Sequence, residues 1–222
     1  MSIKKYINSS IGKKQIVATS GLMVVGFIFF HMVMNLLFLV GPAAYNLLPS
    51  TAHKTGIVFR SVEAVLAGVF LIHIIFTALV TIENRKARGS QGYASFKGKQ
   101  KRSLATRLMP VTGSILLLFI ITHLIDFWWP DHFGPATVVA GVEQGTYGLV
   151  FNSFKNGFRV SWYVIALLAI GMHLAHGVQS MFQSFGFRHQ SYTPKIERLS
   201  TAIGLGISLG FSLIPIYVYF IG

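Results

Sequence analysis

An all-α bundle of five transmembrane helices is the fold class that this sequence predicts. Of its 222 residues, 53% are hydrophobic and only 11% are charged, and the mean hydropathy is +0.61. This composition is too apolar for a soluble domain of the same length. Five segments are also long and apolar enough to cross roughly 30 Å of hydrocarbon as helices. Since they leave no room for a soluble domain, residues 1–222 are expected to form one membrane domain.

The five expected helices are about residues 16–40, 57–82, 108–129, 160–182 and 199–221. The first is longer than the core of a signal peptide and is not followed by a small-residue cleavage site, so we expect it to be retained. Residues 84–107 and 130–159 are rich in turn-forming residues and are expected to be loops or interfacial segments. The fifth helix contains no histidine and no charge beyond Arg198. It is expected only to pack against the others.

The basic residues predict the orientation of the chain. Fifteen of the 19 lysines and arginines lie before the first helix, between the second and third, or between the fourth and fifth. Only Lys54, Arg60, Lys155 and Arg159 belong to the opposite side. By the positive-inside rule, the N-terminus is expected in the cytoplasm and the C-terminus outside. The net charge of +13 thus indicates topology and contact with anionic lipid, and it offers a cytoplasmic face to a soluble partner.

One histidine lies within each of the first four helices: His31, His73, His123 and His173. An ionisable residue inside a membrane span is costly and is therefore a functional candidate. His31 and His123 each lie 15 residues from the expected cytoplasmic edge of their helix, about 22 Å along its axis. His73 and His173 each lie nine residues from that edge, about 13 Å along the axis. The histidines are therefore expected in two pairs, one external and one cytoplasmic.

This pairing predicts two haem b groups. The chain contains no cysteine, which excludes disulfides, covalently attached c-type haem and iron–sulfur clusters held by this chain. A haem iron with two imidazole ligands, one from each of two helices, fits each histidine pair. His176 lies one turn from His173 and is an alternative ligand on the fourth helix. His53, His132 and His189 lie in expected loops and are expected to be solvated.

Several segments in order along the whole chain resemble a known family. They are Ser9–Lys14, Ser20–Gly21, Phe30–Asn35, Leu71–Ile74 with Glu63 upstream, Thr122–Trp128 and Met172–Gly177. They resemble the diheme cytochrome b membrane-anchor subunit of bacterial succinate:quinone oxidoreductases and fumarate reductases, in the form with a single five-helix anchor chain.

The resemblance implies a function and a set of ligands. His31 and His123 would bind the iron of the distal haem, and His73 and His173 that of the proximal haem. The chain would carry electrons between an iron–sulfur partner and a membrane quinone, expected to be menaquinone. FAD and the iron–sulfur clusters would belong to a flavoprotein subunit and an iron–sulfur subunit on the cytoplasmic face of the bacterial inner membrane. Succinate and fumarate chemistry would belong to these partners, and the complex could form a higher oligomer.

One position departs from the pattern of that family. Some quinol-oxidising members carry a glutamate two residues before the ligand on the fourth helix, where this chain has Gly171. The departure argues against a transmembrane proton route through that position.

Five further residues are candidates for supporting roles. Glu63, near the external end of the second helix, is a candidate for proton exchange at the quinone site, with a pair to Arg60 as the alternative reading. Asp126, three residues after His123, is expected near the distal haem or the quinone. Haem propionates are anions that require donors. Candidates near the cytoplasmic interface are Ser20, Arg107 and Arg188.

Three other functions are open to a chain of this kind. One is a different diheme cytochrome b, such as the anchor of a hydrogenase or formate dehydrogenase, which the even distribution of one histidine per helix disfavours. A second is a histidine-lined metal or proton transporter, disfavoured because the spans show no repeat and no carboxylates at the histidine depths. The third is an anchor without haem.

Overall fold

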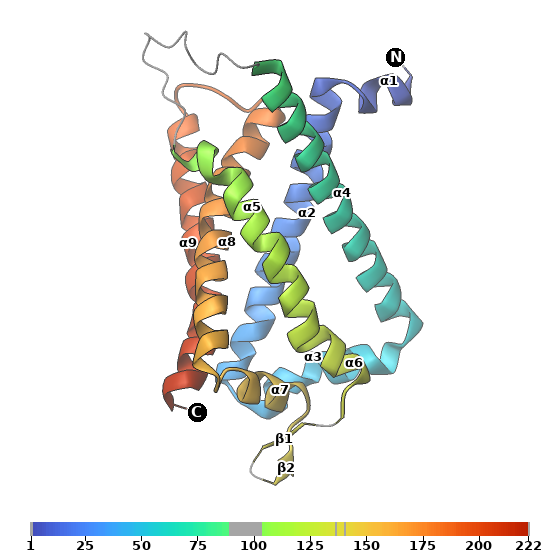
Figure 1. Ribbon diagram of the computed structural model, residues 1–222, viewed down its shortest axis with the longest axis vertical. Coiled ribbons are helices and arrows are strands. Elements are labelled where there is room, and N and C mark those ends of the chain that lie inside the picture. The colour runs from blue at the N-terminus through green and yellow to red at the C-terminus, as the bar shows by residue number, and fades with distance from the viewer. Residues whose placement is uncertain (1, 89–103, 136, 140, 222) are drawn as a thin grey trace.

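Five long helices dominate the computed structural model, which describes residues 2–88, 104–135, 137–139 and 141–221 (Figure 1). They are α2 (Ser10–Leu36), α4 (Ile57–Arg88), α5 (Leu104–His123), α8 (Gly157–Ser184) and α9 (Thr193–Ile221). All five spans built on them are long and apolar enough to cross a membrane. The predicted fold class, an all-α membrane bundle, is thereby confirmed.

Helices α2 and α8 begin before the predicted apolar spans because polar capping residues, not hydrophobicity, determine where they begin. Ser9 caps α2, with its Oγ accepting a hydrogen bond from the Gly12 N–H at 3.0 Å. Asn156 caps α8 in the same way, through the Arg159 N–H at 3.1 Å. Such side chains satisfy the amide groups that a first helical turn leaves without partners. Hydropathy predicts the spans but not these polar first turns.

The third span changes its geometry near its end. The α-helical α5 continues into η2 (Leu124–Trp128), which is a π-helical turn, and then into α6 (Trp129–Phe133). Residues 84–107, predicted as a loop, include the last turn of α4 and the first turn of α5. The rest of that segment, residues 89–103, lies outside the described residues.

Several short elements cover the end of the bundle opposite the N-terminus (Figure 1). After η1 (Leu37–Leu39), the helix α3 (Pro42–Thr55) joins the first span to the second. Gly41 (φ 132°) precedes this helix and Gly56 (φ 55°) follows it. Both have backbone conformations that favour glycine. The segment predicted as loops or interfacial structure contains α6, the two-stranded hairpin β1 (Val138–Val139) and β2 (Val142–Glu143), and α7 (Gly145–Ser153). Asn46 joins α3 to α7, with its amide donating to Gln144 O at 2.8 Å and accepting from the Tyr147 N–H at 2.9 Å.

The two ends of the bundle differ in what they carry. Together with α1 (Ile3–Ile7), the last turn of α4, the first turn of α5 and the α8–α9 connection lie at one end, here called the N-terminal end (Figure 1). Here Lys13 pairs with Glu83 between α2 and α4, and Gln179 donates to Glu197 between α8 and α9 at 2.8 Å. The other end, here called the C-terminal end, carries α3, α6, α7 and the chain terminus.

The most closely packed part of the structure lies between α8 and α9. A Cβ added to Gly171 would lie 2.9 Å from Ser208 Cβ, and one added to Gly204 would collide with Gly171 O. By contrast, none of the residues in the most apolar stretch of α4 is buried within the chain, and α4 leans away from the other helices toward the C-terminal end (Figure 1). The side chains of α4 are therefore open to lipid, to a cofactor or to a partner.

Candidate functional site: two levels of histidine

His31 on α2 and His123 at the end of α5 lie beside each other in the C-terminal half of the bundle. Their ring centroids are 6.0 Å apart, with the ring planes at 85°. Phe27 stacks on His31 at 5.4 Å, and Phe119 and Phe127 lie against His123 at 5.6 and 5.4 Å. Nδ1 of His123 is buried and has no hydrogen-bond partner within the described part of the chain. This pair is called the outer level below.

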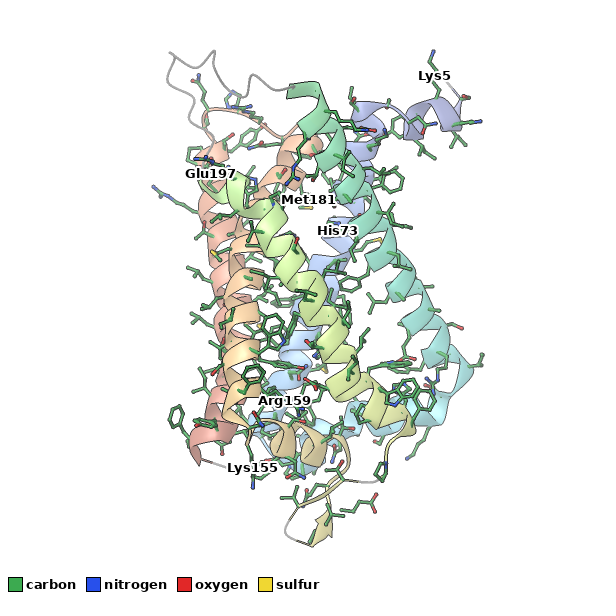
Figure 2. The ribbon with its side chains drawn as sticks, viewed as in Figure 1. Lys5, His73, Lys155, Arg159, Met181 and Glu197 are labelled. Atoms are coloured by element: carbon green, nitrogen blue, oxygen red, sulfur yellow. The ribbon has the colours of Figure 1, made fainter. Side chains whose placement is uncertain are left out.

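His73 and His173 form a second level, here called the inner level, in which each ring is held by a hydroxyl group of a neighbouring helix. Ser20 Oγ on α2 lies 3.2 Å from Nδ1 of His73 on α4. Thr112 Oγ1 on α5 lies 3.1 Å from Nδ1 of His173 on α8. The two imidazoles are close enough to interact electrostatically. Figure 2 shows His73 nearer the N-terminal end of the bundle and Arg159 near the opposite end.

The same sequence spacing joins the two levels on both α2 and α5. Ser20 precedes His31 by eleven residues, and Thr112 precedes His123 by eleven. Eleven helical residues span about 16 Å, so the two levels are separated by about that distance along the helix axes. The order of a hydroxyl residue, a glycine and a histidine therefore recurs with the same spacing in α2 and α5. This short repeat was not recognised from the sequence.

A glycine follows each of these hydroxyl residues and gives the inner imidazoles their space. A Cβ added to Gly21 would lie 3.2 Å from Cε1 of His73, and one added to Gly113 would lie 3.6 Å from Cε1 of His173. Gly21 lies in one of the segments on which the family resemblance rests. Its contact with His73, on another helix, was not predicted from the sequence.

His173 and His176 differ in their contacts. His173 faces α5 through Thr112 and Gly113. His176 is partly buried one turn away and is close enough to His173 to interact with it electrostatically. Of these two histidines, His173 contacts α5 in the way that His73 contacts α2, with a hydroxyl group at Nδ1 and a glycine beside Cε1.

A polar cluster at the C-terminal end contains Glu63, together with a histidine that the sequence analysis placed wrongly. Glu63 Oε1 accepts a hydrogen bond from Trp128 Nε1 at 2.9 Å and lies 3.2 Å from His132 Nε2. The His132 side chain is only 4% exposed and stacks on Trp128 at 4.5 Å. The prediction that His132 is solvated is therefore wrong, because α6 continues the third span and folds its ring against α4. Arg60 lies 3.6 Å from Glu63 Oε2, as the i, i+3 spacing predicted.

Asp126 belongs to a separate cluster between η2 and α8. Its Oδ2 accepts a hydrogen bond from the Tyr163 hydroxyl at 3.0 Å, and its Oδ1 lies 3.3 Å from Arg159. Asp126 and Arg159 also border a cavity of about 260 Å³. The cavity is lined by Thr122, Ile125, Asp126, Asn156, Phe158, Arg159 and Trp162. An arginine thus lies beside Asp126 on the side of the bundle away from Glu63.

The remaining candidates lie at the N-terminal end. Arg107 and Arg188 are exposed, and neither forms an ion pair within the described ranges. Ser20 is buried against His73, so its hydroxyl already holds an imidazole, and its expected role toward a propionate stays a prediction. His189 is exposed, as predicted; for His53 only its position within α3 is described.

Comparisons with protein-family models, with curated proteins and with solved structures find no match to this chain. A function for the two histidine levels therefore depends on their geometry and chemistry.

Proposed function

We propose that this chain is the membrane anchor and electron-transfer subunit of a bacterial succinate dehydrogenase or fumarate reductase complex, with two haem b groups. The observation that carries the proposal is the arrangement of four imidazoles from four helices in two levels about 16 Å apart along the helices. Two such levels suit electron transfer across the membrane.

The inner level fits a haem with two axial imidazoles. When Nδ1 of an imidazole donates to a hydroxyl oxygen, the ring is fixed in the tautomer whose Nε2 carries the lone pair that a metal needs. Ser20 and Thr112 can impose this tautomer on His73 and His173. Gly21 and Gly113 keep the same rings free of neighbouring side chains.

The outer level fits a second haem for different reasons. His123 Nδ1 is a buried polar atom without a partner among the described residues, and aromatic rings surround both histidines. On His31, the Asn35 amide nitrogen lies 3.3 Å from Nε2, and the Asn35 amide oxygen accepts a hydrogen bond from the Tyr45 hydroxyl at 3.2 Å. Haem binding through Nε2 of His31 would displace Asn35 from this nitrogen. Bound haem b supplies reversible one-electron transfer.

Each reaction partner is expected at one end of the bundle. The basic N-terminal end, with Arg107 and Arg188 exposed, suits docking of the iron–sulfur subunit on the cytoplasmic face. The quinone is expected at the C-terminal end, because the Glu63 cluster lies beyond the outer level there. The Glu63 side chain is 23% exposed, so it can exchange protons with water while it contacts groups inside the bundle. Asp126, beside its cavity and Arg159, is the alternative quinone contact.

Single histidine substitutions in the purified complex test the proposal. Either His31→Ala or His123→Ala should remove one haem, and either His73→Ala or His173→Ala should remove the other, as measured by haem content and reduced-minus-oxidised spectra. His189→Ala, at an exposed position, is the matched control. Loss of the inner haem in His176→Ala but not in His173→Ala would overturn the assignment on α8.

Purification from the native membrane tests the assignment of partners. The chain should co-purify with a flavin-containing subunit and an iron–sulfur subunit, and the complex should couple succinate oxidation to quinone reduction or the reverse. Co-purification with a hydrogenase or a formate dehydrogenase instead would refute the succinate assignment while leaving the haem assignment intact.

A further inference from the structure

His132 occupies an unusual position for a charged or titratable residue, between three groups that accept hydrogen bonds. Its Nδ1 lies 2.8 Å from the Trp128 backbone carbonyl oxygen, and its Nε2 lies 3.2 Å from the Glu63 carboxylate. Asp131 Oδ2 lies 3.9 Å from Nδ1. Arg60 lies on the far oxygen of Glu63, at 3.6 Å.

The chemistry of these contacts determines where protons can reside. A carbonyl oxygen can only accept, so Nδ1 must carry a proton and donate it. An ionised carboxylate can also only accept, so Nε2 facing Glu63 requires one more proton, either on Nε2 or on the carboxyl group. Glu63 Oε1 and His132 Nε2 are therefore close enough, at 3.2 Å, to exchange this proton once the imidazole rotates, because the contact does not have hydrogen-bond geometry as it stands.

The two members of the pair differ in exposure. The His132 side chain is 4% exposed and that of Glu63 is 23% exposed. The Glu63 carboxylate also accepts a hydrogen bond from Trp128 Nε1. Trp128 follows His123 by five residues through the π-helical turn η2, so the pair lies beyond the outer histidine level, toward the C-terminal end. The pair thus lies next to the expected electron donor, and Glu63 is its more exposed member.

We propose that His132 is a positioning residue for quinone reduction, which holds Glu63 in place and shares its exchangeable proton. The inference rests on the proposed function, because the substrate is a membrane quinone. Each quinone takes up two electrons, delivered through this chain from the reduced iron–sulfur partner, and two protons. For each proton, an O–H bond of the Glu63 carboxyl group breaks as a quinone O–H bond forms. His132 then passes its Nε2 proton to the carboxylate, and water on the C-terminal side reprotonates the pair. The product is the quinol.

The test compares His132→Gln and Glu63→Gln with two matched controls, His189→Gln and Glu143→Gln, both at exposed positions. Quinone reduction by the whole complex is measured against pH, alongside haem content and electron transfer from succinate to a soluble dye that bypasses the quinone site. Both test variants should lower kcat for quinone reduction roughly tenfold or more and change its pH profile. Haem content, dye reduction and both controls should match the wild type.

A second readout does not depend on turnover. In a Trp129→Phe, Trp162→Phe background, Trp128 is the single tryptophan of the chain, and protonation of the stacked His132 ring should quench its fluorescence. The pH dependence of this emission should disappear in His132→Gln and persist in His189→Gln. If His132→Gln fails to assemble, Glu63→Gln carries the measurement of kcat and its pH profile.

The outcomes separate the two hypotheses. A wild-type protein that contains no haem, or that has no quinone reductase activity, refutes the proposed function. This holds whether or not the Trp128 emission depends on pH. A wild-type complex that reduces quinone, with a His132→Gln variant of unchanged kcat and pH profile, refutes the role of His132 alone. Emission from Trp128 that does not respond to His132→Gln also refutes it.

Discussion

At the scale of single residues, the hydroxyl groups beside the inner histidines are as informative as the histidines themselves. Ser20 and Thr112 come from different helices, yet each contacts Nδ1 of a histidine on the helix packed against it, at 3.2 and 3.1 Å. A group that fixes the tautomer of a metal ligand usually affects the site nearly as much as the ligand does.

Removing either hydroxyl should weaken haem binding at the inner level. Ser20→Ala and Thr112→Val each delete a hydrogen bond to Nδ1 and leave the imidazole in place, so we expect roughly 10- to 100-fold weaker retention of that haem. Haem content after extended dialysis in detergent measures the effect. Ser114→Ala, at an exposed position on α5 where the hydroxyl donates to the Pro110 carbonyl, should retain both haems. Equal loss in all three variants would contradict the assigned role.

Some of these residues could be identified from the sequence and others could not. A histidine within an apolar helix is visible as an exception to its surroundings, so the four candidates were found directly. His132 was misjudged because its burial depends on α6 folding against α4, which brings Glu63 and Trp128 to it from segments 65 residues apart in sequence. Tyr163 and Arg159 beside Asp126 were missed for the same reason.

At the scale of elements, small residues determine how α8 and α9 pack. Gly171 and Gly204 face each other across that interface, and close approach of backbones at small residues is the usual way in which membrane helices associate. This packing also gives a physical reason for glycine at position 171. A glutamate there would start with its Cβ 2.9 Å from Ser208 Cβ and would project toward α9.

Two alanine substitutions on α9 test this interface with a matched change. At Gly204 an added Cβ would meet the backbone of α8, whereas at Gly206 it would meet nothing within 4 Å. Both substitutions raise helix propensity equally, so Gly204→Ala should be less stable than Gly206→Ala by about 1–3 kcal/mol through overpacking. The thermal midpoint of the detergent-solubilised protein reports the difference. Equal midpoints would show that α9 is not held in this way.

The elements outside the membrane spans were the hardest to predict. Helix α3 is less apolar than the spans, and it is held by contacts such as that of Asn46 with Gln144 at the start of α7, 98 residues away. The π-helical turn η2 accompanies contacts of Thr122, Asp126 and Trp128 with two different helices. Hydrophobic length predicts that a segment spans the membrane, but such long-range side-chain contacts decide its local geometry.

At the scale of the whole molecule, the distribution of charge predicts the orientation in the membrane. Because the chain contains no cysteine, single-cysteine variants report topology without background. Lys5 lies at the N-terminal end and Lys155 at the opposite end (Figure 2). In intact cells, an impermeant maleimide should label Lys155→Cys and should label Lys5→Cys only after the membrane is opened. The reverse pattern would contradict the predicted orientation and place the basic N-terminal end outside the cell.

The account as a whole depends on two haem groups held by four histidines. The most direct measurement is the dithionite-reduced minus oxidised optical spectrum of the purified protein, with haem quantified against protein. We predict b-type absorption and two haems per chain, reduced to one in His31→Ala and in His73→Ala, with both haems lost when these two substitutions are combined. A purified, folded wild-type protein without b-type absorption would contradict the account.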